Sequence, residues 1–346
     1  MLISAKPLIG FNSQTHSLPC LSCDCHIANF IPFHQHPVLT FHLLTLDLSG
    51  NQFENTLILS WIFGFRSLVS LDLSDNYFQG PIPVVFQNMT SLSHLDLSFN
   101  NFNSSIPNWL YSFSRLEFLN LGYSNLQGTI SSAIGNLTFA IRIDLSYNEI
   151  GGQLPRSLGN LYNLREIILS GNKWSQEISE ILESLSGCLS DRLEISDLSF
   201  SQLHGHLTGE LGVFKNLVQL SFQNNSISGP LPVSLANLTS LRFLNLGKNQ
   251  FNGTLLHSFG QLSKLKALYI YSNMLKGVVS EVHFANLTSL RVLSAFENQL
   301  TLKASPHWIP PFQLEILSLQ SWNLGPKFPQ WLCSQRRMQI LDISCT

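Results

Sequence analysis

One pattern of apolar and polar positions repeats from Leu43 to the last residue of the chain. Most units read L-x-x-L-x-L-x-x-N, and they begin at Leu43, Leu68, Leu92, Leu116, Ala140, Leu164, Leu193, Leu217, Leu241, Leu265, Leu290, Leu314 and Met338. Nine of the twelve spacings between starts are 24 residues, two are 25 and one is 29. So regular a period predicts a solenoid in which each unit forms one coil.

The fourth and sixth positions of a unit are apolar, as in Leu71 with Leu73 or Leu244 with Leu246. Residues two apart in an extended segment point to the same side, so each unit is expected to contribute one short strand. One coil cannot bury these side chains alone, whereas stacked coils cover one another. Each buried Leu then stabilises the fold by roughly 1.5 to 3 kcal/mol.

Asn occupies the ninth position in nine of the thirteen units: Asn51, Asn76, Asn100, Asn148, Asn172, Asn225, Asn249, Asn273 and Asn298. A side-chain amide both donates and accepts hydrogen bonds, so a stacked column of Asn can satisfy backbone groups where each coil turns. Ser124, Ser201, Trp322 and Thr346 replace Asn in the other units. We expect that Trp322 cannot bond in this way, because it carries an indole in place of an amide.

Gly follows at the thirteenth position in many units, and Pro often comes after it (Gly80, Gly128, Gly152, Gly205, Gly229, Gly253, Gly277; Pro83, Pro107, Pro155, Pro232, Pro329). Gly permits the tight turn and Pro fixes φ after it. The resulting consensus, seen in LDLSDNYFQGPIP (71–83) and LSFQNNSISGPLP (220–232), resembles the plant-specific class of leucine-rich repeats. The resemblance implies an α/β repeat fold: a curved right-handed superhelix with a parallel sheet on its concave face and short 3-10 or irregular convex segments.

The segment WIPPFQLEILSLQSWNLGPKFPQWL (308–332) resembles the ectodomain of plant receptor-like proteins, particularly those similar to fungal-xylanase elicitor receptors. In that family more repeats follow, then an acidic stretch, one membrane helix and a short tail without a kinase. This chain stops at Thr346, inside its thirteenth unit, and holds neither an apolar run of about 18 residues nor a convincing export signal. We therefore expect a truncated ectodomain from the extracellular face of the plasma membrane, attached only through a missing C-terminal region.

Residues 1–42 do not match the cysteine-paired cap that opens the family's ectodomains, so the repeat domain is expected to span 43–346. Cys20, Cys23 and Cys25 cluster near several His residues, which is compatible with zinc. Because no second paired element follows at finger spacing, we favour a degenerate cap or a miscalled segment and expect no metal. Cys188 and Cys333 lie six coils apart, too far for a disulfide.

Seven Asn residues stand in N-x-S/T sequons and are candidate glycosylation sites: Asn88, Asn103, Asn136, Asn224, Asn237, Asn252 and Asn286. Three of them fall at one position of the repeat, where N-L-T also belongs to the ordinary consensus of the repeat. Together with the family resemblance, the sequons favour an exported and glycosylated chain.

The third, fifth, seventh and eighth positions of each unit are expected to form the concave surface. In the early units they follow the consensus, with Asp47, Asp72, Asp96 and Asp144 at the fifth position. From Leu217 onward the consensus breaks down, and aromatic residues enter that are costly to expose without a partner. The candidate ligand-binding residues are Gln219, Gln223, Phe243, Asn245, Lys248, Tyr269, Tyr271, Phe296, Glu297 and Gln320. The alternative is that these are drifted positions of a degraded array.

Nineteen Lys and Arg against 21 Asp and Glu give a formal charge of −2, so no nucleic-acid footprint is visible. The phosphate-loop, zinc-protease, nucleophile-elbow and kinase motifs are absent from the sequence, and we expect no catalytic residue and no cofactor. Two functions remain. The favoured one is a receptor-like protein of plant defence or development that binds a peptide, protein or glycan and signals through partner receptor kinases. The alternative is a soluble cell-wall hydrolase inhibitor similar to polygalacturonase-inhibiting proteins.

Overall fold

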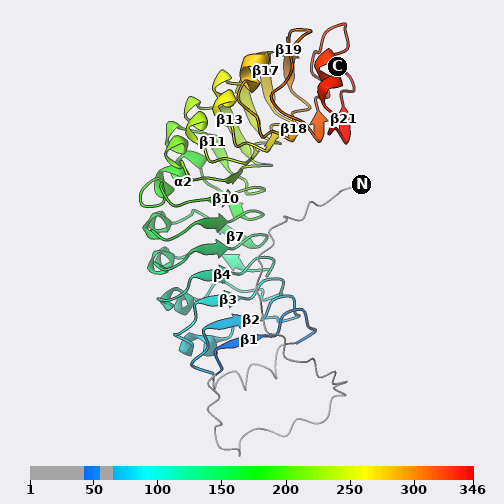
Figure 1. The fold of residues 1–346 in the computed structure, drawn as a ribbon. Coiled ribbons are helices and arrows are strands. Elements are labelled where there is room, and N and C mark those ends of the chain that lie inside the picture. The colour runs from blue at the N-terminus through cyan, green and yellow to red at the C-terminus, as the bar shows by residue number, and fades with distance from the viewer. Residues whose placement is uncertain (1–42, 55–64) are drawn as a thin grey trace, which may run out of the picture. The chain divides into compact units, whose positions relative to one another are not determined.

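The computed structural model describes residues 43–54 and 65–346, which form a stack of coils (Figure 1). Cys20, Cys23 and Cys25, and the boundary expected at residue 42, lie outside the described residues. In the repeat region Cys188, Cys333 and Cys345 are free and exposed, in agreement with the expectation that Cys188 and Cys333 do not pair.

One strand from each of the thirteen predicted units enters a parallel sheet. Its strands, in spatial order, are β1 (Thr45–Asp47), β2 (Ser70–Asp72), β3 (His94–Asp96), β4 (Phe118–Asn120), β6 (Arg142–Asp144), β8 (Glu166–Ile168), β10 (Ile195–Asp197), β12 (Gln219–Ser221), β14 (Phe243–Asn245), β16 (Ala267–Tyr269), β18 (Val292–Ser294), β20 (Ile316–Ser318) and β21 (Ile340–Asp342). Equivalent positions face each other throughout, as Leu71 faces Leu95 and Leu244 faces Leu268. The register keeps every column of the repeat in line along the sheet.

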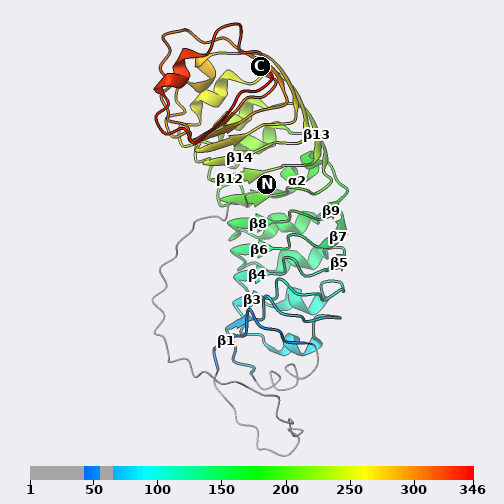
Figure 2. The ribbon, with the colours of Figure 1, turned by 90° about the vertical axis from the view of Figure 1, so that its right-hand side faces the viewer.

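Two smaller parallel sheets run beside the main one, just after the turn of each coil (Figure 2). The first contains β5 (Gln127–Gly128), β7 (Glu149–Gly152) and β9 (Lys173–Trp174). The second contains β11 (His204–His206), β13 (Ser226–Pro230), β15 (Gln250–Gly253), β17 (Met274–Val279) and β19 (Gln299–Leu302). The thirteenth-position glycines, Gly80 to Gly277 in the series given above, all have φ between 74° and 103°, the region that Gly adopts at little cost.

Short 3-10 helices close most coils on the side opposite the main sheet (Figure 1). They are η1 (Val84–Asn88), η2 (Asn108–Ser112), η3 (Ser132–Asn136), η4 (Arg156–Asn160), η5 (Gly209–Val213), η6 (Val233–Asn237), η7 (His257–Gln261), η8 (Glu281–Phe284) and η9 (Gln330–Ser334). The 29-residue unit instead forms an α-helix, α2 (Ile178–Leu185), which buries Ile178, Ile181, Leu182 and Leu185. The extra five residues are thus taken up without disturbing the sheet.

The Asn column behaves as the sequence predicts. The Asn76 amide donates to the Leu48 carbonyl of the preceding coil at 2.9 Å and to two carbonyls of its own coil, while its oxygen accepts the Phe53 N–H at 3.1 Å. The hydroxyl of Ser124 takes over the first of these bonds with a 2.9 Å contact to the Leu97 carbonyl. The column therefore ties each coil to the one before it.

The expectation for Trp322 is wrong. Its side chain is 1% exposed, and its indole N–H donates to the Ala295 carbonyl of the preceding coil at 2.8 Å. Asn298, one coil earlier, makes the equivalent bond to the Ile270 carbonyl at 2.9 Å. The column needs one donor aimed at the coil before, and an indole N–H supplies it as well as an amide does.

Candidate binding surface on the main sheet

Four aromatic side chains gather on the outer face of β14, β16 and β18. Rings of Phe243 and Tyr269 lie 5.5 Å apart, those of Tyr269 and Tyr271 lie 6.5 Å apart, and those of Tyr271 and Phe296 stack at 4.8 Å. Each of the four side chains is partly buried, and burial raises the pKa of both tyrosines. These residues, called the aromatic cluster below, were all among the sequence-predicted set.

Tyr271 reaches across to the neighbouring coil, where it covers Gly247. A Cβ at Gly247 would lie 2.6 Å from Cε1 of Tyr271, so the ring occupies the space that a side chain would take. Residue 247 is the seventh position of its unit, on the sheet face. The absence of a side chain there lets the ring of Tyr271 approach the backbone of the neighbouring coil.

The other predicted residues divide by exposure. Lys248 and Glu297 are exposed, whereas Gln219, Gln223 and Gln320 are partly buried. Asn245 is 7% exposed; its amide donates to the Gln223 side chain at 2.8 Å and its oxygen accepts the Gly247 N–H at 3.0 Å. Asn245 thus positions its neighbours rather than offering surface to a ligand. The Gln320 amide donates to the Asp342 carboxylate of the next coil.

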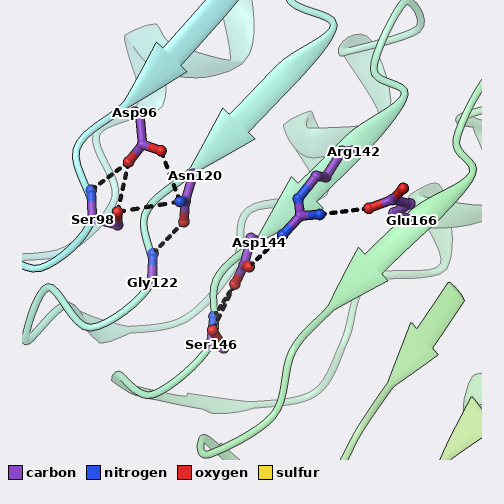
Figure 3. Close-up of polar contacts among 8 residues, drawn as sticks. All are labelled: Asp96, Ser98, Asn120, Gly122, Arg142, Asp144, Ser146 and Glu166. Carbon is purple, nitrogen blue, oxygen red and sulfur yellow. Dashed lines mark hydrogen bonds and ion pairs between the residues drawn. The ribbon is translucent and has the colours of Figure 1, made fainter. Parts of the chain in front are cut away.

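Asp at the fifth position has a structural task in the early units. The Asp96 carboxylate accepts the Ser98 N–H at 2.9 Å and the Ser98 hydroxyl at 2.6 Å, which closes the turn after the strand (Figure 3). Asn120 does the same for the Gly122 N–H at 3.1 Å and also donates to Asp96 at 2.9 Å. At the first unit, the Ser49 N–H and hydroxyl lower the pKa of the Asp47 carboxyl in the same arrangement.

A charged group lies between the early and late units. The Arg142 guanidinium donates to Glu166 at 2.6 Å and to Asp144 at 3.3 Å (Figure 3), and its carbon stands 5.6 Å from the centre of the Phe118 ring. Phe118 in turn stacks on His94 at 4.2 Å. Third-position side chains of adjacent strands therefore form a continuous row that links an imidazole, a phenyl ring, a guanidinium and a carboxylate.

The sequence reading missed a second aromatic group, at the eighth position of the early units. Phe99, Tyr123, Tyr147 and Phe200, called the rim stack below, are 53%, 44%, 43% and 39% exposed. A signal was present in the sequence, because the eighth position reads Phe, Tyr, Tyr, Gly, Phe from the third unit to the seventh.

Asp72, His94 and Asp96 come together on β2 and β3, where one ligand atom from each lies within 4.8 Å of the others. Two carboxylates and an imidazole suit a divalent transition metal. Both carboxylates, however, already accept the hydroxyl of the Ser two residues along, at 2.6 Å in each case. Proximity alone is the feature that points to an ion, so we assign Asp72 and Asp96 to the turn-closing Asp residues of the fifth position, called the Asp column below, and His94 to the third-position row.

All seven sequon residues are exposed. Asn88, Asn136 and Asn237 each end a 3-10 helix, on the side away from the main sheet. Asn224 is different, because it holds the eighth position of its unit, next in line after Phe200 of the rim stack. The sequence holds no sequon between Asn136 and Asn224.

Comparison with known families supports the repeat assignment. A model described as Leucine rich repeat matches residues 66–126, and one described as Leucine Rich Repeat matches 42–65, 141–161, 216–238 and 240–262. In the part of the chain that the structure describes, we find no helix with the length and apolar character that crossing a bilayer requires.

Curated relatives match parts of the chain. Receptor-like protein EIX1 of Solanum lycopersicum is 53% identical over 70 residues, which cover 20% of this chain and 7% of the relative. Receptor-like protein 13 of Arabidopsis thaliana is 42% identical over 133 residues, which cover 38% of this chain and 12% of the relative. The chain thus matches only a small part of the length of these relatives.

Solved structures share the fold over most of the chain. A TDR receptor superposes with a TM-score of 0.75 at 25% identity, over 87% of this chain and 55% of that one. The Arabidopsis receptor kinase HAESA, solved with the peptide hormone IDA and the co-receptor SERK1, gives 0.75 at 26% identity, over 88% and 55%. The chain is a leucine-rich-repeat solenoid, and parts of its sequence are similar to plant receptor-like proteins.

Proposed function

We propose that the outer face of the main sheet binds a ligand, and that the chain is the extracellular recognition module of a plant receptor-like protein in defence or developmental signalling. The aromatic cluster carries this proposal. Its rings come from three adjacent coils and are only partly covered by the protein itself. Partly exposed aromatic groups packed side by side are the usual energetic centre of a binding interface.

The ligand is a peptide, a protein or a glycan, since stacked tyrosine rings offer apolar faces and hydroxyls to each of these. HAESA was solved together with a peptide hormone and a co-receptor, which shows that a solenoid of this fold can hold both. We propose that this chain likewise passes its signal to partner receptor kinases. It acts as a binding protein and not as an enzyme, because the carboxylates of the Asp column close turns instead of facing a shared pocket.

A triple replacement tests the proposal: Tyr269→Ala, Tyr271→Ala and Phe296→Ala. The chain is titrated with a fungal xylanase, with synthetic secreted peptides and with xylan oligosaccharides, by surface plasmon resonance. A probe that binds the wild-type chain is expected to bind the triple variant about a hundredfold more weakly, because several hot-spot side chains are removed together. The melting temperature, followed by circular dichroism, should change little, because the three side chains are not part of the core.

Two further variants sharpen this test. Tyr162→Ala removes a ring that is 48% exposed and follows η4, away from the main sheet, and should leave binding unchanged. Gly247→Ala keeps every ring but displaces Tyr271, so it should weaken binding by itself. A probe that binds the triple variant as tightly as the wild-type chain contradicts the proposal. Inhibition of a polygalacturonase by the chain would instead support the inhibitor function.

We also propose that the exposed sequons carry glycans when the chain passes through the secretory pathway. Expression in plant cells, followed by peptide-N-glycosidase treatment in heavy-oxygen water, marks each occupied Asn by a mass change. Asn88, Asn136 and Asn237 are expected to be marked, because each lies at the end of a 3-10 helix and its side chain is open to solvent. Unmarked peptides at all three positions would count against export by this route.

A further inference from the structure

Two parts of the repeat domain carry opposite net charge. Units one to seven, residues 43–216, hold eight Lys and Arg against sixteen Asp and Glu, whereas units nine to eleven, residues 241–313, hold seven against two. The formal charge of the whole chain is −2, so the total conceals this separation. Clustered charge of one sign attracts a partner of the opposite sign. Units nine to eleven therefore favour an acidic partner, and they are the units that carry the aromatic cluster.

The second position of the unit lines up three cations along these coils. Arg242, Lys266 and Arg291 stand directly before β14, β16 and β18, and all three are exposed. The Lys266 N–H donates to the Arg242 carbonyl at 2.8 Å, and the Arg291 N–H donates to the Lys266 carbonyl at 2.8 Å. Neighbouring strands lie about 4.8 Å apart, so these bonds hold the three residues in a line along the solenoid. They are called the cationic row below.

The same column shows how the chain itself compensates such a cation. Arg165 is followed in the next coil by Glu194, and their side chains pair at 2.5 Å. Arg291 also has an acidic residue in the next coil and pairs with it at 3.1 Å. Arg242 and Lys266 are each followed by another cation, and among the described residues no ion pair includes either of them. Two adjacent positive charges of the cationic row therefore have no acidic neighbour in their column.

The cationic row borders the aromatic cluster. Phe243 directly follows Arg242, and Tyr269 lies three residues after Lys266 on β16. Both features run along the solenoid through the same three coils, with the cations on the side where the strands begin. An extended peptide directs successive side chains to opposite sides. A peptide laid along the coils can thus place every second side chain on the rings and the side chains between them on the cationic row.

We propose that the cationic row selects a polypeptide ligand in which acidic side chains alternate with apolar ones, and that Arg242 and Lys266 bind its carboxylates. The Arg guanidinium presents its N–H donors in a planar fork that matches a carboxylate, and the Lys ammonium adds a second positive charge. This inference rests on the proposed function, because it assigns a ligand class to the same face of the sheet. It adds the direction in which the ligand lies and the charge that the ligand carries.

The test uses the chain purified from plant cells, so that any glycan at Asn237 or Asn286, five residues before Arg242 and Arg291, is present. The probe is acetyl-Asp-Leu-Asp-Leu-Asp-amide, whose capped ends leave the side chains as its only carboxylates. The matched control, acetyl-Asn-Leu-Asn-Leu-Asn-amide, has nearly the same size and the same apolar side chains without the charge.

Surface plasmon resonance measures both peptides on the wild-type chain. At about 50 mM sodium chloride, the acidic peptide is expected to bind with a Kd of about 0.1 mM and the neutral peptide about tenfold more weakly. At about 1 M sodium chloride the two peptides should bind alike, because salt screens the attraction between exposed charges.

Two double variants decide the assignment. Arg242→Gln with Lys266→Gln should weaken the acidic peptide about tenfold and leave the neutral peptide unchanged. Its melting temperature should stay that of the wild-type chain, since both side chains are exposed. The matched control, Arg165→Gln with Lys173→Gln, removes the same charge from two exposed, ion-paired positions of the sixth unit. It should leave the affinity for the acidic peptide within about twofold.

Equal affinity of the two peptides for the wild-type chain, no binding of the acidic peptide, or an equal loss in the two double variants would each overturn the proposal. The Tyr269, Tyr271, Phe296 triple variant separates this inference from the proposed function. If the wild-type chain binds both peptides equally and the triple variant binds neither, the aromatic cluster stands and the cationic row has no part in it. An undiminished affinity of the triple variant for the acidic peptide would support the cationic row and contradict the aromatic cluster.

Discussion

Replacement of Asn148 by Ala is expected to lower the free energy of unfolding by about 3 to 5 kcal/mol, which is a large loss for one buried polar side chain. Its amide donates to the Leu121 carbonyl at 2.8 Å and to Leu145 and Ser146 at 3.0 and 3.2 Å. Its oxygen accepts the N–H groups of Ser124 at 3.0 Å and Leu126 at 2.9 Å. The side chain is 5% exposed, so water cannot replace these bonds when the amide is removed.

Asn51 supplies the matched control in the same column. It is exposed and donates to two carbonyls of its own coil, at 3.0 and 3.1 Å. Asn51→Ala should therefore cost less than about 1 kcal/mol, since solvent takes over both bonds. Urea unfolding followed by circular dichroism measures both variants. Equal losses in the two would show that the column stabilises the fold through its residue type alone and not through burial.

Three replacements at Trp322 separate its packing from its hydrogen bond. Trp322→Ala removes both and should cost about 4 kcal/mol or more, because a large cavity opens and the Ala295 carbonyl loses its partner. Trp322→Asn restores a column donor but leaves the cavity, and should still cost about 3 kcal/mol. Trp322→Phe keeps most of the buried area and loses the N–H, at about 1 to 2 kcal/mol.

The order of these losses is the decisive measurement, again by urea unfolding. Ala is expected to be the most harmful, then Asn, then Phe. An Asn variant as stable as the wild-type chain would mean that the donor matters and the ring does not. A Phe variant as destabilised as the Ala variant would mean that the hydrogen bond of the indole accounts for the loss and that the packing of the ring does not.

Much of the architecture could be predicted because repetition constrains it. A spacing of 24 or 25 residues places Leu71 opposite Leu95 and Leu244 opposite Leu268, so the strand positions, the buried columns and the solvent-facing columns all follow from the period. The 29-residue unit shows that one coil can be longer than the others while the sheet stays the same. Its extra residues become α2, on the far side from the main sheet, and the register from β8 to β10 is preserved.

Prediction failed where one residue type replaced another in the same task. An indole differs from an amide in shape and in its lack of an acceptor, but the Ala295 carbonyl of the preceding coil requires only one donor, which Trp322 supplies. Asn245 looked like ligand-binding surface, although its side chain is buried beside Gly247 and turned toward Gln223. In both cases the role of the side chain depends on the direction of one hydrogen bond, and that direction cannot be predicted from the amino-acid sequence.

The sequence by itself determined the coil, its period, the columns that are buried and the columns that face solvent, because these depend on a repeating alternation that every unit obeys. Only the tertiary structure decided which side chains on the exposed columns meet. Tyr271 lies over Gly247 and Tyr147 lies over Gly171, because the space left by a missing side chain in one coil is filled from a neighbouring coil. Such contacts join residues from different coils, and their geometry is settled by rotamers and by the space that neighbouring coils leave.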